Sequence, residues 1–264
     1  SIPQGIFLPH ERPHLKSFKK LGFTGNIEKV LNDAYLVNPN LVSCFYSASP
    51  MWAANSATFS PSMDNIDNEI HITVANLNSM MHRSIEPNFT YKMLKCIFNK
   101  KVNINKSLLN LPNIGDEGAA NHIRIAERHN MPGYQIFVYS SEDISQAKNI
   151  ERQSLISSKL IARKNCVEDQ RVFYLQQSNR AIQYGSFHND IVSTANENIF
   201  IYHEEAFESN LELKTILAKL KKLVPNFKPI KILNSEIDLK TIVSSYLLNS
   251  QLISLPSGGM MFLL

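Results

Sequence analysis

A histidine and an aspartate two residues apart, His188 and Asp190, are the side chains whose types and spacing best suit chemistry. They follow Gly185 and precede the β-branched residues Ile191 and Val192, which predict a strand. Residues two apart on a strand point to the same face, so the imidazole and the carboxylate would project together from the start of that strand. Such a pair suits proton transfer on one substrate. A histidine that only hydrogen-bonds its own turn is the simpler explanation of this motif taken alone.

An acidic pair between two glycines, Gly115-Asp116-Glu117-Gly118, is the second candidate. The chain has only nine glycines, so two of them around one acidic pair indicate a place where the backbone approaches another group closely. Carboxylates, together with amide oxygens, suit a planar cation with several N–H donors, such as a guanidinium. A charged turn on the surface is the alternative.

These stretches favour neither a metal site nor a nucleotide cofactor. Zinc and iron sites usually gather two or three His or Cys ligands, a pattern that these motifs do not show. The sequence has neither G-x-x-x-x-G-K-[ST] nor G-x-G-x-x-G, the glycine patterns of phosphate-binding loops. We therefore expect no metal and no cofactor.

The composition is that of an ordinary folded protein, with 44% hydrophobic and 19% charged residues. The net charge of +4 is spread along the chain, and the basic cluster of Lys219, Lys221 and Lys222 falls on a predicted helix, so no nucleic-acid partner is expected. No apolar run is long enough to predict a membrane span. Three widely spaced cysteines argue against a disulfide framework and favour a reducing compartment such as the cytoplasm.

The elements that must position the candidate residues repeat along the chain. Four predicted hairpins open on polar residues, Asn55, Glu117, His188 and Asn249, at intervals of roughly 60–70 residues. Each of the first three is followed by a helix, and the helix by a further strand where the sequence allows one to be identified, which makes a ββαβ unit. Such a unit cannot bury its sheet alone, so copies pack around a common axis and the opening residues would meet at one end of it. We expect one α/β domain over residues 1–264.

Hydrophobic periodicity and capping residues place the helices within these units. Asn26 is expected to cap the first helix. The others are expected near residues 91–98, 153–163, 207–223 and 240–248. Cys96 would lie on the apolar face of its helix, in the core. In the long helix the residues expected to face the core are Phe207, Leu211, Ile216, Leu217, Leu220 and Leu223.

Six motifs, in order along essentially the whole chain, resemble those of N-succinylarginine dihydrolases. They are MWAANSAT at 51–58, TVANL at 73–77, HRS at 82–84, GDEGAANH at 115–122, FHND at 187–190 and YLLNSQL at 246–252. The resemblance implies membership of the guanidine-modifying (pentein) superfamily, whose fold is a five-bladed α/β propeller. This chain would supply about four of the five blades.

The resemblance implies a hydrolase that acts on the guanidinium of N2-succinylarginine and gives N2-succinylornithine, two ammonia and carbon dioxide. It further implies that this enzyme belongs to arginine catabolism and is a homodimer. Glu117 and His188 match two members of a Cys-His-Glu triad. The positions that match substrate-binding residues are Asn55, His82, Arg83, Arg152 and Asp190. Either arginine would suit the succinyl carboxylates, and Asp190 would hold guanidinium nitrogens.

The nucleophile that the resemblance implies has no counterpart in this chain. In the family the cysteine lies near the C-terminus after a Gly-rich segment, and Cys44, Cys96 and Cys166 match no such position. An N-terminal substrate-binding loop is missing as well. Because a thiolate must attack the guanidinium carbon, we expect an inactive fragment of a longer enzyme.

Three alternatives stay open at this point. The parent could be another guanidine-modifying enzyme, of the arginine deiminase type. The chain could be a catalytically dead module that captures arginine-like ligands. An interaction scaffold would instead require an exposed apolar patch unrelated to Glu117 and His188.

Overall fold

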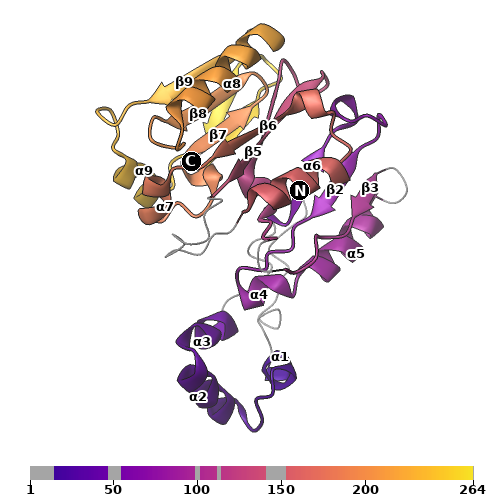
Figure 1. Ribbon diagram of the computed structural model, residues 1–264, viewed down its shortest axis with the longest axis vertical. Helices are drawn as coiled ribbons and strands as arrows, with labels where there is room; N and C mark the ends of the chain where they lie inside the picture. The colour runs from indigo at the N-terminus through magenta and orange to yellow at the C-terminus, as the bar shows by residue number, and fades with distance from the viewer. Residues whose placement is uncertain (1–14, 47–54, 99–101, 112–113, 141–152, 264) are drawn as a thin grey trace.

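Three small sheets of identical design form the body of the molecule (Figure 1). The computed structural model describes residues 15–46, 55–98, 102–111, 114–140 and 153–263. In each sheet the first two strands are antiparallel and the third is parallel to the second. A helix lies between the second and third strands, because a parallel connection needs a crossover. The predicted ββαβ repeat is thus confirmed.

The first unit contains β1 (Ala57–Ser60), β2 (His71–Val74), α5 (Pro87–Phe98) and β3 (Asn103–Asn105). The second contains β4 (His122–Ala126), β5 (Gly133–Tyr139), α6 (Leu155–Lys164) and β6 (Val172–Gln176). The third contains β7 (Ser193–Asn196), β8 (Ile199–His203), α8 (Asn210–Leu223) and β9 (Lys228–Ile232). A hairpin of β10 (Gln251–Ser254) and β11 (Met260–Leu263) follows α9 (Leu239–Ser245).

Further short helices and 3-10 turns lie before, within and between these units. Among the described residues they are α1 (Leu15–Lys20), α2 (Ile27–Val37), α3 (Pro39–Tyr46), α4 (Met81–Ser84), α7 (Asn179–Gln183), η4 (Ser62–Asp64), η6 (Gly118–Asn121), η8 (Asp169–Arg171) and η9 (Asn189–Ile191). Helices α1 to α3 lie apart from the sheets in Figure 1 and pack on each other through Phe18, Val30 and Ala34. Asn26 caps α2 by accepting a hydrogen bond from the Lys29 amide, as predicted.

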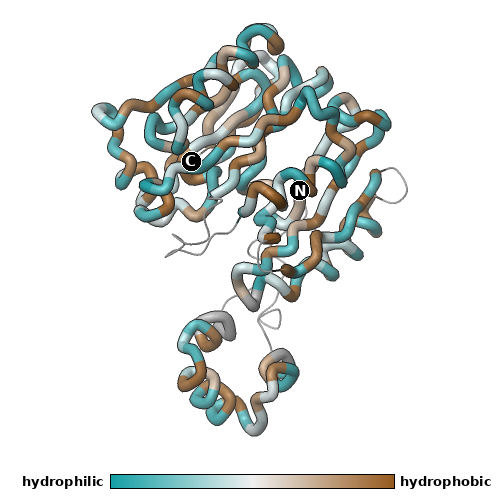
Figure 2. The backbone as a smooth tube through the Cα atoms, in the orientation of Figure 1, coloured by the Kyte–Doolittle hydropathy of each residue, from teal (hydrophilic) through white to brown (hydrophobic). Residues whose placement is uncertain are grey.

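The main core lies between the second and third sheets and α8. Helix α8 buries Leu213, Ile216, Leu217 and Leu220, and the alternation of hydrophobic and hydrophilic residues that produces this face is visible in Figure 2. The prediction was wrong for Leu211 and Leu223, which are 77% and 47% exposed. Both lie in the end turns of the helix, where Leu213 and Leu220 fill the core-facing positions instead.

The prediction for Cys96 was also wrong, because this thiol is exposed. Helix α5 packs through Pro87 and Thr90, and Cys96 lies on a different face of the helix. No helix in the described part of the chain has the length and apolar character needed to cross a membrane.

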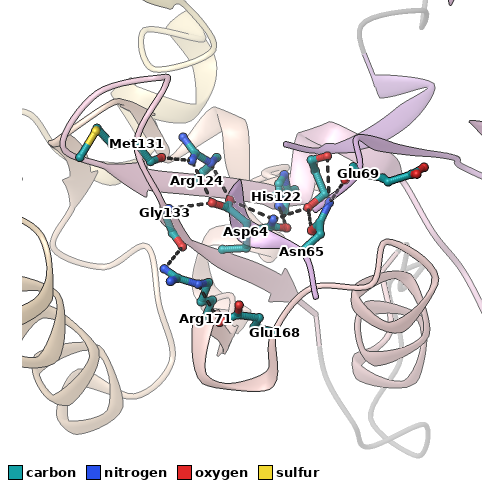
Figure 3. Close-up of polar contacts among 11 residues, drawn as sticks. Asp64, Asn65, Glu69, His122, Arg124, Met131, Gly133, Glu168 and Arg171 are labelled. Atoms are coloured by element: carbon teal, nitrogen blue, oxygen red, sulfur yellow. Dashed lines mark hydrogen bonds and ion pairs between the residues drawn. The ribbon is translucent and has the colours of Figure 1, made fainter. Parts of the chain in front are cut away.

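A buried ion pair joins the first unit to the second (Figure 3). Asp64, in η4, is fully buried and accepts hydrogen bonds from Arg124 Nε at 2.6 Å and Nη2 at 2.9 Å. The Gly133 amide donates to the same carboxylate at 2.7 Å. Nearby His122 lies 2.9 Å from Gln135 Oε1, and burial lowers its pKa to about 4. This imidazole is therefore a neutral hydrogen-bonding group.

Asp64→Asn should lower the free energy of unfolding by about 3 kcal/mol or more, because it leaves the Arg124 guanidinium without its counter-charge. The matched control is Asp33→Asn, which removes the exposed α2 pair with Lys29 and should cost less than about 0.5 kcal/mol. Urea denaturation of both variants measures the difference. Equal effects would show that the Asp64 pair does not hold the two units together.

Candidate active site

Glu117 and His188 are in direct contact, although they belong to different units. His188 Nε2 lies 2.9 Å from Glu117 Oε2, and both residues are buried. Glu117 immediately precedes η6 and β4 of the second unit, and His188 precedes η9 and β7 of the third. The expected meeting of residues that open successive hairpins is confirmed for this pair.

The backbone at His188 differs from the predicted strand. Residues Asn189–Ile191 form the single 3-10 turn η9, and β7 begins only at Ser193. The Asn189 side chain accepts from Ser193 Oγ at 2.8 Å, which stabilises the turn in place of an extended chain. Ile191 and Val192 are buried core residues. Their β-branched side chains therefore indicate burial at this position, although the backbone is not a strand.

Three further groups hold the Glu117 segment. Ser79 Oγ donates to Oε1 at 2.7 Å, and Arg83 Nη1 lies 2.6 Å from Oε2. The Glu117 amide donates to Gln153 Oε1 at 2.7 Å. Burial alone would raise the pKa of Glu117, but the hydrogen bond with His188 and the charge of Arg83 outweigh it and lower the pKa below its ordinary value. Glu117 is therefore an ionised carboxylate in a buried site.

Gly118 allows the first unit to meet the second at this point. Its φ is +65°, and a Cβ there would lie 2.1 Å from the carbonyl oxygen of Asn55. The predicted close approach of the backbone is confirmed at this glycine. Asn55, the residue that opens the first hairpin, contacts this loop through its main chain.

Two more carboxyl groups lie beside the pair. Burial raises the pKa of Asp190 to about 6, against the opposing effects of the His188 charge and a hydrogen bond from Asn249. Its Oδ1 atom is buried and has no hydrogen-bond partner in the described part of the chain. Burial, helped by the charge of Glu117, raises the pKa of Asp116 to about 7.

The structure tells less about the other predicted substrate-binding residues, Arg83, His82 and Arg152. Arg83 is almost fully buried, and its recorded ion pair is with Glu117, so its binding of a substrate carboxylate stays a prediction. His82 lies on α4, where only its backbone is described. Arg152 lies outside the described residues.

Sequence reasoning missed Ser79, Gln153 and Asn121. Gln153 was expected inside a helix, but α6 begins at Leu155 with Ser154 as its cap, which leaves Gln153 to face Glu117. Asn121 Oδ1 accepts the Asn189 amide at 2.8 Å and so joins the two turns that carry the pair. Ser154, directly before the apolar residues Leu155 and Ile156, was the available signal for the later helix start.

A family model described as succinylarginine dihydrolase (AstB) matches residues 1–264. The chain belongs to this family. The match spans every element described above, including the segments that carry Glu117 and His188.

Solved structures give weaker matches. One is the apo form of ArgZ, an arginine dihydrolase from the ornithine-ammonia cycle in cyanobacteria, at 15% identity and a TM-score of 0.49 over 76% of this chain and 25% of that chain. Another is SxtG, an amidinotransferase from the saxitoxin biosynthetic pathway of Microseira wollei, at 10% identity and a TM-score of 0.38 over 61% of this chain and 44% of that chain. This chain thus spans well under two thirds of either.

Gly118→Ala should destabilise the protein more than Gly258→Ala. Both glycines have positive φ, which costs a residue with a Cβ roughly 1–2 kcal/mol. A Cβ at Gly258 would meet nothing within 4 Å, whereas at Gly118 it would collide with the Asn55 carbonyl. Thermal unfolding of the two variants tests this. Equal losses would mean that the loop can move away from Asn55 at no cost.

Asp116→Asn should flatten the pH dependence of stability. The pKa of Asp116 rises from 3.8 to about 7 on folding, so between these values the native state holds a proton that the unfolded chain has lost. Stability therefore falls as pH rises through this window, by at most roughly 1.4 kcal/mol per pH unit from this group. The amide removes that slope. Asp190, whose pKa is raised to about 6, leaves a residual slope in the variant.

Denaturant unfolding from about pH 4.5 to 7.5 measures these slopes. The control is Asp238→Asn, since Asp238 is an exposed helix cap whose pKa is lowered and so titrates below the window. Identical slopes in wild type and Asp116→Asn would contradict the assignment.

Proposed function

We propose that this chain provides the histidine and glutamate of an enzyme that hydrolyses the guanidinium of N2-succinylarginine to N2-succinylornithine, ammonia and carbon dioxide. The observation that carries the proposal is the buried 2.9 Å contact between His188 and Glu117, in a chain of this family. A carboxylate beside an imidazole orients the ring and stabilises its protonated form. That combination suits proton delivery to a departing amine.

The neighbouring carboxyl groups support a cationic substrate. Asp190 has a buried oxygen without a hydrogen-bond partner among the described residues, so it is able to accept an N–H from a bound guanidinium. A positively charged ligand would also lower the pKa of Asp190 and so favour its ionised form. We assign Asp190 to guanidinium binding, and Asn55, His82, Arg83 and Arg152 to the remaining substrate contacts.

The reaction requires a thiolate, which we propose comes from outside these 264 residues. The thiolate would add to the guanidinium carbon, and the C–N bond would break as His188 gives its proton to the departing ammonia. Water would then replace sulfur at that carbon, with His188 taking up a proton, which leaves a ureido group and one ammonia. A second round of the same steps would release the second ammonia, and the resulting carbamate would lose carbon dioxide to leave the amine of N2-succinylornithine.

We also propose that the three ββαβ units and the last hairpin are about four blades of a five-bladed α/β propeller, within one domain. In that arrangement the loops that carry Asn55, Glu117, His188 and Asn249 surround one opening. A cytoplasmic homodimer follows from the family resemblance and belongs to the same proposal.

The full-length protein that contains this chain should release ammonia from N2-succinylarginine, and not from free arginine. Glu117→Gln and His188→Ala should each lower the rate by about 10²–10⁴-fold, the usual contribution of general acid–base groups. The control is Glu205→Gln, which removes only the exposed ion pair with Arg180 and should leave the rate unchanged. Release from free arginine instead would point to a deiminase-type enzyme.

A catalytically dead binding module is the second candidate, favoured by the lack of a matching cysteine. The two proposals differ for the isolated chain. The enzyme proposal places the thiolate and its side of the pocket outside these 264 residues, so it expects weak or no binding of succinylarginine by the isolated chain. A binding module requires tight binding by calorimetry.

A further inference from the structure

We propose that Asp67, His71 and Cys166 form a zinc site at the junction of the first and second ββαβ units. The sequence predicted no metal, and this cluster is unrelated to the Glu117–His188 pair. His71 begins β2, whereas the chain that leaves the other end of β2 leads to Ser79 and the Glu117 carboxylate.

The donor atoms are already gathered. One carboxylate oxygen, one imidazole nitrogen and the thiol sulfur lie within 4.8 Å of one another. His71 Nε2 is 2.8 Å from Asp67 Oδ2. The His71 side chain is 7% exposed and that of Asp67 is 40% exposed, so the site is open to solvent on the carboxylate side. An ion can enter there, and water can supply the fourth ligand.

The backbone holds all three residues in place. The Ile66 amide donates to the Cys166 carbonyl at 2.8 Å, and Asn65 forms an antiparallel bridge with Val167. Cys166 thus belongs to a paired segment, and Asp67 directly follows it. His71 is fixed by strand pairing with Ser60 and Asn103. A site whose ligands stand on paired backbone loses little chain entropy when it binds a metal.

The donor set suits zinc better than magnesium or calcium. Zn²⁺ accepts thiolate, imidazole and carboxylate ligands together, whereas the harder cations prefer oxygen ligands alone. Tetrahedral zinc with ordinary bond lengths separates its ligand atoms by about 3.3–3.6 Å. Asp67 and His71 would therefore move apart by less than about 1 Å. On binding, the Cys166 thiol releases its proton to solvent and the sulfur coordinates as thiolate.

Without a metal, the Asp67 carboxylate accepts a hydrogen bond from His71 Nε2 at 2.8 Å, so the ring proton lies on the nitrogen that would coordinate. Zinc binding through Nε2 requires this proton to leave for solvent or to move to Nδ1. Asn105 Nδ2 lies 3.4 Å from His71 Nδ1, but it has nearer acceptors in Thr73 Oγ1 at 3.2 Å and the Lys164 carbonyl at 3.0 Å. This amide therefore does not fix the position of the ring proton.

A nucleophilic thiol is the competing interpretation of the same cluster. Burial and the neighbouring Asp67 carboxylate raise the pKa of Cys166, so the thiol is not activated for attack, and a bound metal would have to displace its proton.

Titration of the metal-free protein with Co²⁺ tests the proposal. Wild type should bind about one ion per chain and develop a thiolate-to-cobalt charge-transfer band in the near ultraviolet, which Zn²⁺ removes by displacement. Cys166→Ser should abolish the band, and His71→Gln should weaken Co²⁺ binding by at least tenfold. Cys44→Ser/Cys96→Ser, which leaves Cys166 as the remaining thiol, should keep the band.

Circular dichroism of each variant separates loss of the site from loss of the fold. Zinc should also raise the Tm of wild type and leave that of Cys166→Ser unchanged. Absence of the band in folded wild type, or its survival in Cys166→Ser, would overturn the proposal.

Discussion

A charged carboxylate without solvent must be surrounded by donors, and this requirement at Glu117 determines how the repeats meet. His188 comes from the third unit, Ser79 and Arg83 from the first, and the carboxylate itself from the second. None of these four residues lies in a strand. The site therefore exists only when three successive units pack with the correct register.

The same junction between the first and second units carries polar groups at both ends of β2. At one end, Gly118 lets the Glu117 loop approach Asn55. At the other, the fully buried Asp64 binds Arg124 and the Gly133 amide. Directional contacts of this kind fix the relative position of two sheets more tightly than apolar packing does, because a displaced donor leaves a buried group unsatisfied.

The ββαβ order and the Glu117–His188 contact were predictable from sequence, since hairpin spacing and the polar residue that opens each hairpin are both visible there. The short turns before the strands were not. At His188, side-chain hydrogen bonds of Asn189 decide between turn and strand, and the buried pattern of Ile191 and Val192 is the same in either. Local propensity cannot separate those two outcomes.

The predictions that Leu211, Leu223 and Cys96 are buried failed for a related reason. Periodicity identifies a helix but leaves the edges of its buried face to the neighbouring elements. Contacts made by Ser79, Gln153 and Asn121 were equally hidden, because each depends on a partner from 36 to 68 residues away. Single polar residues in loops give no sign of such a partner.

A double-mutant cycle between Glu117→Gln and His188→Gln, read as free energies of unfolding in urea, measures the contact on which the rest depends. The account predicts that the two single losses do not add, with a coupling energy of at least about 1 kcal/mol. Additive losses within about 0.3 kcal/mol would show that the two side chains do not meet, and would contradict the arrangement of the repeats.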